Sequence, residues 1–224
     1  MKDFALFLKP YPNNNPTTNV LGMYDEMQTK LEDQIVSTQG ILAQIGSKAQ
    51  RSLLYRDSKS WEKRLKDLFD LIEEVQKCQR IWMYLEPIFA SDDIGKTLPE
   101  ELAMFKVVDI LWRSTMEYCV ENPLLNDLVD RENIAAHFID ANKNLADIQR
   151  HLNDYLDSKC QSFPRFYFLA DDDLLKILAQ TKDPTLVQPH MSKCFEGIKK
   201  VVFEGNGIVT GMVSAEGEVV KFTK

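Results

Sequence analysis

The tripeptide GKT at residues 95–97 matches the end of the phosphate-binding loop of many nucleotide hydrolases. That loop also needs a glycine five positions earlier, because its backbone N–H groups cradle the phosphates, and it connects a buried strand to a helix. Here the earlier position is Ala90, and a helical pattern precedes it. Residues 98–101 (LPEE) are a typical helix start, with proline and acids in the first turn. We interpret the tripeptide as an interhelical turn with a solvated lysine.

Other side chains that could do chemistry are scattered along the chain. The acidic run Asp171, Asp172 and Asp173 could bind a divalent cation, but capping of a short helix at 172–180 explains it. Cys194 follows His190 by four residues, and nothing in the sequence orients this histidine as a base. The sequence therefore predicts no catalytic residue, no cofactor site and no metal site in this segment.

Four aromatic residues surround one arginine, Arg165: Phe163, Phe166, Tyr167 and Phe168. Pro164 is incompatible with a helix interior, so we expect residues 163–169 to be extended and buried between helices. An arginine in such a cluster usually stacks on the rings or pairs with a carboxylate. We therefore interpret the cluster as a structural corner.

Apolar residues recur every three or four positions in four stretches, which predicts four long helices: residues 31–45, 58–86, 99–121 and 131–160. We expect Ser58 or Ser60 to cap the second helix and Pro87 to end it, while Asn122-Pro123 ends the third. The three tryptophans fall at core positions of these helices. A helix of about 30 residues is about 45 Å long. The fold class predicted is mainly α, an elongated bundle of long antiparallel helices.

The two ends of the chain differ from the middle. Residues 10–19 hold three prolines and four asparagines, so we expect an irregular segment over 1–19. Residues 20–200 form the helical segment. Residues 201–224 read as three short strands joined by glycine turns, a small antiparallel β meander packed on the helices.

Composition excludes several classes of protein. The 224-residue chain has a net charge of −7, whereas nucleic acids and anionic membranes need a basic face. No run of about 18 apolar residues suggests a transmembrane helix, and no secretory signal is visible. The four cysteines lie far apart, as expected for reduced thiols in the cytoplasm.

Several longer stretches of the sequence are similar to those of a known protein family. LEDQIVSTQ (31–39), WMYLEPIF (82–89), FPRFYFLADDDLLKIL (163–178) and IVTGMVSAEGE (208–218) resemble the linker region of dynein heavy chains, in the same order. The resemblance runs from about residue 20 to the C-terminus. TKDPTLVQPHMSKCFEGI (181–198) is more similar to axonemal than to cytoplasmic dyneins.

The resemblance implies a mechanical role. Dynein heavy chains are AAA+ motors that use ATP and Mg, and the linker is a helical arm that bends and straightens over the ring of its own heavy chain. Microtubules and other dynein subunits would contact other regions of that chain. The implied location is the cytoplasm and cytoskeleton, in the axoneme of a cilium or flagellum.

An arm that swings needs a hinge and a reversible contact surface. Hinges lie at the ends of elements, so the candidates are the breaks at Pro87, Gly95, Asn122, Pro123, Ser162 and Pro164. For contact with the ring we expect the charged meander residues Glu216, Glu218 and Lys221.

Two other functions fit the same sequence. A free-standing helical scaffold or adaptor would be a short natural protein with exposed apolar grooves for a peptide. An enzyme with a cryptic site around residues 171–173, His190 and Cys194 would show activity as an isolated fragment. The motor arm predicts that the native gene continues past Lys224 into an ATPase ring.

Overall fold

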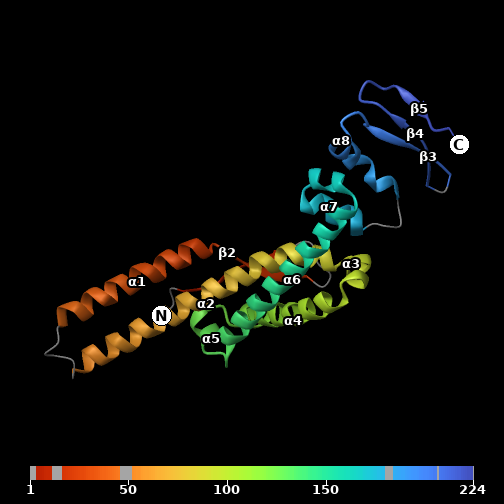
Figure 1. The fold of residues 1–224 in the computed structure, drawn as a ribbon. Coiled ribbons are helices and arrows are strands. Elements are labelled where there is room, and N and C mark those ends of the chain that lie inside the picture. Colours follow the sequence, from red (N-terminus) through yellow and green to blue (C-terminus); the bar gives the residue numbers. More distant parts are fainter. Residues whose placement is uncertain (1–3, 12–16, 46–51, 180–183, 206, 224) are drawn as a thin grey trace. The chain divides into compact units, whose positions relative to one another are not determined.

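A computed structural model describes residues 4–11, 17–45, 52–179, 184–205 and 207–223 (Figure 1). The chain divides into two compact units. Unit 1 comprises residues 1–85 and 104–146, and unit 2 comprises residues 86–103 and 147–224. Three long helices contribute residues to both units: α2 (Leu53–Phe89), α4 (Pro99–Glu121) and α6 (Ile134–Ser162).

Unit 1 begins with an antiparallel hairpin. Strand β1 (Phe7–Tyr11) pairs with β2 (Thr18–Gly22), and Leu8 lies opposite Leu21. The expectation of an irregular segment over residues 1–19 is therefore wrong for 7–11 and 18–19. Proline is tolerated in β1 because this strand has only one neighbour in its two-stranded sheet. The side chain of Gln79 fixes β2, since its Oε1 accepts from Leu21 N at 2.7 Å and its Nε2 donates to Leu21 O at 2.9 Å.

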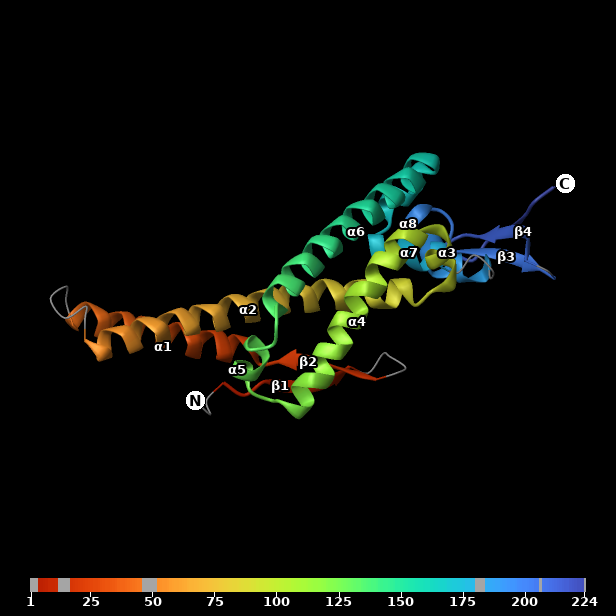
Figure 2. The same ribbon diagram turned by 90° about the horizontal axis from the view of Figure 1, so that it is seen from below.

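Two helices pack side by side in unit 1. Helix α1 (Tyr24–Ile45) lies beside the N-terminal half of α2 in both views (Figure 1 and Figure 2). Leu31 and Leu65 are fully buried, and Gln39 donates to Glu62 across the pair at 3.3 Å. Helix α2 begins earlier than expected, because Ser52 Oγ, and not Ser58 or Ser60, accepts the Tyr55 N–H at 3.2 Å.

Aromatic rings join the helices in the core of unit 1. The rings of Trp82 and Trp112 stack with their centroids 5.5 Å apart. Tyr11 packs on Trp82 at 5.3 Å, and Phe138 meets Trp112 edge-on at 6.4 Å. The core assignment of these two tryptophans is confirmed, since both are 0% exposed. Unit 1 also contains the short helix α5 (Leu125–Val129).

Unit 2 contains short elements and the meander. Its helical pieces are α3 (Asp92–Thr97), η2 (Pro164–Phe168), α7 (Asp171–Ala179), η3 (Pro184–His190) and α8 (Met191–Cys194). Its strands β3 (Lys200–Glu204), β4 (Ile208–Val213) and β5 (Val219–Lys221) form an antiparallel sheet in the order β3-β4-β5. A mainly α fold with a small C-terminal meander is thus confirmed. None of the helices in the described part of the chain is long and apolar enough to cross a membrane.

Three local expectations differ from the structure. The sequence predicts an interhelical turn at the GKT tripeptide, but these residues lie inside the short helix α3. Lys96 is exposed, as expected. Pro87 does not end α2, which continues to Phe89. Helix α7 begins at Asp171, one residue earlier than expected. The start of α4 at Pro99, with Glu100 and Glu101 in its first turn, agrees with the sequence.

Candidate functional site

Two of the candidate hinge residues, Pro87 and Gly95, lie within α2 and α3 and not in the break between these helices. Pro87 is in the last turn of α2, where it removes one backbone hydrogen bond. It stands two residues beyond Leu85, the last α2 residue of unit 1. Gly95 lies in α3 of unit 2, and a Cβ added there would meet Leu102 Cδ2 at 3.0 Å. Close packing explains this glycine without a hinge.

The break at Asn122 and Pro123 is held by the N-terminal segment. Asn122 Nδ2 donates to Tyr118 O at 3.1 Å, at the C-terminal end of α4. Leu6 N donates to Pro123 O at 2.7 Å, and Leu125 N donates to Phe4 O at 2.9 Å. The break therefore belongs to a hydrogen-bonded ladder within unit 1.

The candidate hinge at Ser162 and Pro164 joins α6 to η2 within unit 2. Ser162 is the last residue of α6, and its Oγ donates to Ser158 O at 2.9 Å. Pro164 opens the 3₁₀ helix η2, a position in which its missing N–H costs no hydrogen bond. Residues 164–168 are therefore helical, and the expected extended crossing is wrong.

The aromatic corner is braced but not buried. Arg165 stacks on the ring of Phe195 at 4.6 Å, and its Nη1 donates to Cys194 O at 3.0 Å. Phe163 meets Phe166 edge-on at 4.9 Å. Tyr167 and Phe168 are 59% and 69% exposed, so the prediction of a buried corner is wrong for them. Arg165 stacks on an aromatic ring, as predicted. The ring is that of Phe195, the C-terminal cap of α8, and not one of the aromatic cluster at residues 163–168.

The meander presents the three charges expected to form a contact surface. Glu216, Glu218 and Lys221 are exposed, and they lie in or beside β5. Gly217 has a φ of 93°, a left-handed conformation that suits glycine in the turn between β4 and β5. The Glu218 N–H donates to Ser214 Oγ at 3.1 Å and fixes this turn.

Gln188 attaches the other edge of the meander to η3. Its Nε2 donates to Val201 O at 2.6 Å, and its Oε1 accepts from Val201 N at 3.0 Å. One side chain thus satisfies both backbone groups of a residue in β3. The meander is thereby joined to the short helical pieces of unit 2.

The residues of the cryptic-site alternative form an ion-pair cluster. Asp173 forms an ion pair with Lys193, and the hydrogen bond from Lys193 is the main cause of the lowered pKa of Asp173. Asp173 Oδ1 also lies 3.7 Å from His190 Nδ1. Cys194 is buried, and burial raises the pKa of its thiol, the opposite of an activated nucleophile. Among the described residues, no group of three or more histidine, cysteine, aspartate or glutamate side chains is arranged to hold a metal ion.

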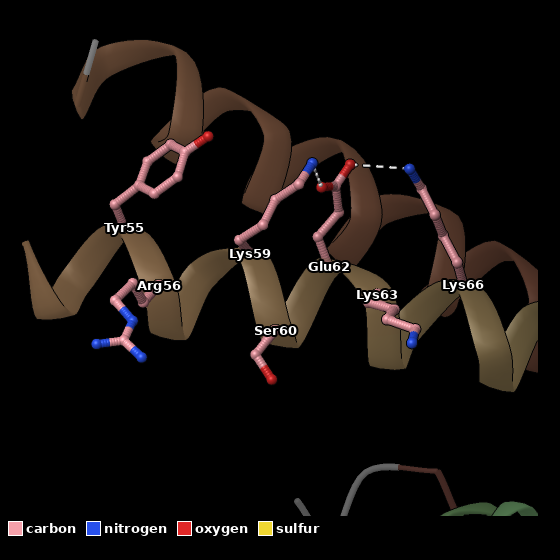
Figure 3. Close-up of a pocket in the computed structure, with 7 residues that line it drawn as sticks. All are labelled: Tyr55, Arg56, Lys59, Ser60, Glu62, Lys63 and Lys66. Carbon is pink, nitrogen blue, oxygen red and sulfur yellow. Dashed lines mark hydrogen bonds and ion pairs between the residues drawn. The ribbon is translucent and has the colours of Figure 1, made fainter. Parts of the chain in front are cut away.

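A groove that sequence reasoning missed lies along the N-terminal turns of α2 (Figure 3). Its volume is about 560 Å³, and its lining includes four basic side chains: Arg56, Lys59, Lys63 and Lys66. Glu62 lies between two of them, with its Oε2 2.7 Å from Lys59 Nζ and its Oε1 2.9 Å from Lys66 Nζ. The signal was available, because residues 55–66 hold five basic and two acidic residues in an acidic chain.

The electrostatics of Glu62 follow from these contacts. The hydrogen bond from Lys59, followed by those from Lys66 and Gln39, lowers the pKa of Glu62 from 4.5 to about 2. Hydrogen bonds from cationic donors stabilise the ionised carboxylate, which is itself buried. The cluster links α1 and α2 through the Gln39 contact.

We expect Glu62→Gln to weaken the dependence of stability on acid pH. Because the folded-state pKa is lowered, the stabilisation is present above the ordinary value of 4.5 and is lost as the pH falls toward about 2. Urea unfolding across this window should show a smaller loss for Glu62→Gln than for the unchanged chain. Lys59→Gln removes the hydrogen bond that contributes most to the lowered pKa of Glu62, so this variant should also lose less stability as the pH falls. Identical pH profiles for all three proteins would contradict this assignment.

Comparisons with known proteins agree on one family. The family described as "Dynein heavy chain, N-terminal region 2" matches residues 1–224. Dynein axonemal heavy chain 3 of Homo sapiens is 42% identical over 205 residues, which is 92% of this chain and 5% of the relative. Dynein axonemal heavy chain 1 of Mus musculus is 41% identical over 219 residues, 98% of this chain and 5% of the relative. Dynein axonemal heavy chain 12 of Homo sapiens is 41% identical over 202 residues, 90% of this chain and 6% of the relative. The chain thus spans about a twentieth of the length of these relatives.

Proposed function

The chain belongs to the dynein heavy chain family, in its N-terminal region 2, and from this membership we propose that it is part of the linker. The linker is the mechanical arm that bends and straightens over the AAA+ ring of the same heavy chain. That movement is the power stroke of a microtubule motor. We further propose that the segment itself contributes no catalytic residue and no cofactor site, and that the parent chain binds ATP and Mg elsewhere.

One observation carries the proposal: three long helices, α2, α4 and α6, each contribute to both compact units. An arm that transmits force must resist bending along its length, and densely packed helices supply this stiffness. The buried side chains that α2, α4 and α6 contribute to unit 1 include Trp82, Trp112 and Phe138, all 0% exposed. A load applied at one end of α4 or α6 is carried by the continuous backbone hydrogen bonds of the helix.

We place the hinge at Pro87 among the six candidates. It lies two residues beyond the unit boundary in α2 and weakens the last turn of that helix. The alternative at Asn122 and Pro123 is tied by the Leu6 and Leu125 hydrogen bonds. Pro87 also belongs to unit 2 but lies next to its boundary, whereas Gly95, Ser162 and Pro164 lie away from the residues at which the chain passes between the units.

The proposed cellular setting follows from the relatives. Those named above are axonemal dynein heavy chains. We therefore propose the cytoskeleton of a cilium or flagellum as the location, with the axoneme as the working structure. Microtubules and other subunits contact other regions of the parent chain.

The arm must dock reversibly on the ring, and the meander charges offer a contact. We expect Glu216→Lys, Glu218→Lys and Lys221→Glu together to lower the microtubule gliding velocity of the parent heavy chain and to alter its ATPase rate. Reversed charges repel the surface that the original charges attract, an effect that high salt screens. The matched control is Asp154→Lys, Asp157→Lys and Lys176→Glu, the same charge change on α6 and α7. Unchanged velocity and ATPase in the meander variant would refute this contact surface.

A further inference from the structure

Ser60 is an exposed serine of α2 that has no part in the proposed stroke. Among the residues that the structure describes, none forms a hydrogen bond with its Oγ. Figure 3 shows Arg56, Ser60 and Lys63 pointing to one side of the helix, away from the cluster in which Glu62 bridges two lysines. The serine hydroxyl is therefore open to solvent, with a basic residue on either side of it along the helix.

Three of the four nearest neighbours of Ser60 on the helix face are basic. Residues three and four positions apart are neighbours on the surface of a helix. For Ser60 these positions hold three basic residues and one acid: Arg56, Lys63, Arg64 and Asp57. Arg64 is already held by Asp130, with both guanidinium Nη atoms 2.6 Å from its carboxylate oxygens. Within the described ranges, Arg56 and Lys63 form no ion pair, and both are exposed.

These two cations suit a phosphoryl group on Ser60 Oγ. A phosphoserine carries a charge of about −2 near neutral pH and three acceptor oxygens, and it forms charge-assisted hydrogen bonds with nearby cations. Arg56 and Lys63 can both pair with it without breaking an existing ion pair. The phosphoryl group would also bring negative charge toward the N-terminal end of α2, whose first turn holds no acidic residue.

The first two turns of α2 are also the part of this helix that opens most easily. A kinase has to reach the serine oxygen inside its own cleft, so a helical target must unwind locally. No side chain in residues 52–61 is buried, and the first buried apolar residue of α2 is Leu65. Segments with few buried contacts open at a low free-energy cost. Unwinding α2 as far as Ser60 therefore exposes no core residue.

We propose that Ser60 is a phosphorylation site, modified by a serine kinase that accepts basic residues on both sides of its target. Ser60 Oγ attacks the γ-phosphorus of ATP bound as its magnesium complex, the bond from this phosphorus to the bridging oxygen breaks, and ADP leaves. The hydroxyl proton passes to the general base of the kinase. The phosphoryl group then pairs with Arg56 and Lys63 and holds the N-terminal turns of α2 in the helical form.

Ser58 provides a matched contrast only two residues away. Its neighbours at three and four positions include no basic residue: Leu54, Tyr55, Trp61 and Glu62. A phosphoryl group on Ser58 would face the carboxylate of Glu62, and like charges at this spacing destabilise a helix. The same modification should therefore stabilise the start of α2 at Ser60 and destabilise it at Ser58.

The first part of the test asks which serine is modified. The 224-residue chain is incubated with protein kinase C, a serine/threonine kinase of basic specificity, and with ATP and Mg. Mass spectrometry of its peptides then locates the phosphate. We expect phosphate on Ser60, removed by Ser60→Ala and retained in Ser58→Ala.

The second part measures what the phosphoryl group does, with phosphoserine introduced directly at position 60 or at position 58. Hydrogen exchange reports the opening of the first two turns of α2. Phosphoserine at 60 should slow this exchange about threefold, because it gains two ion pairs on the helix surface, and phosphoserine at 58 should speed it. Arg56→Gln with Lys63→Gln should abolish the slowing. Lys106→Gln with Lys143→Gln, at exposed positions of α4 and α6, should leave it unchanged.

Each part has a result that would overturn the proposal. Phosphate on Ser58 and not on Ser60, or no phosphate on Ser60 of the folded chain, would remove the assignment of the site. Equal slowing by phosphoserine at 58 and at 60 would show that the neighbouring cations are irrelevant. Slowing that persists after Arg56→Gln with Lys63→Gln would lead to the same conclusion.

Discussion

Replacing Trp82 by alanine should lower the free energy of unfolding by about 3–5 kcal/mol. Trp82 is 0% exposed and lies at the junction of α2, α4 and β1. The substitution removes the stacking on Trp112 and the contact with Tyr11, and it leaves a cavity that rigid helices fill only in part. It also removes the hydrogen bond that Trp82 Nε1 donates to Asp109 Oδ1 at 3.0 Å.

Urea unfolding followed by circular dichroism measures this loss. Ile110→Ala, a large apolar residue on α4 that is 68% exposed, serves as the control and should change stability by about 0.5 kcal/mol or less. Trp82→Phe keeps an aromatic ring and should cost less than Trp82→Ala. Similar losses for Trp82→Ala and Ile110→Ala would mean that the aromatic stack is not the core that holds the three long helices.

The long helices and their buried faces were predictable from the sequence. In α6, apolar residues at steps of four and three include Phe138, Leu145 and Ile148, and all are 0% exposed. The spacing of apolar residues identifies the buried face here because a long helix presents the same face to its neighbours for many turns. The meander was predictable because glycines mark both of its turns.

The N-terminal hairpin was not predictable, because its stability comes from contacts distant in the sequence. Local composition over residues 10–19 favours a loop. The deciding contacts are the two hydrogen bonds between Gln79 and Leu21, which join residues 58 positions apart. The spacing of residues along a strand or helix cannot reveal a contact between residues so far apart in the sequence.

The aromatic corner shows a different limit. Pro164 argues against a helix interior over residues 163–169, but proline is favoured in the first turn of a helix. The 3₁₀ helix η2 begins at Pro164 for that reason. Aromatic content suggested burial, whereas Tyr167 and Phe168 remain largely exposed. The net charge of the whole chain does not reveal the basic groove, because the basic residues of the groove are concentrated in residues 55–66 of an acidic chain.

The second large effect concerns the continuity of α6. Ala146 is exposed and is the last α6 residue of unit 1. A proline at this position lacks the N–H that bonds to the carbonyl of Asn142, and its ring clashes with that carbonyl, so Ala146→Pro should lower the stability of the isolated chain by about 3 kcal/mol or more. Asn142 also donates to Glu74 O at 2.9 Å, so the distortion reaches a contact with α2 within unit 1. Ala146→Ser keeps the backbone hydrogen bond and should cost about 0.5 kcal/mol.

The most direct test of the arm is the microtubule gliding velocity of the parent heavy chain with Ala146→Pro, measured together with its microtubule-stimulated ATPase rate. Ala146→Ser is the matched control. If this segment is a lever, an interrupted α6 transmits less force and displacement, so the proline variant should glide more slowly while its ATPase rate stays close to that of the control. Equal gliding velocities for the two variants at equal ATPase rates would contradict a lever-arm role for this segment.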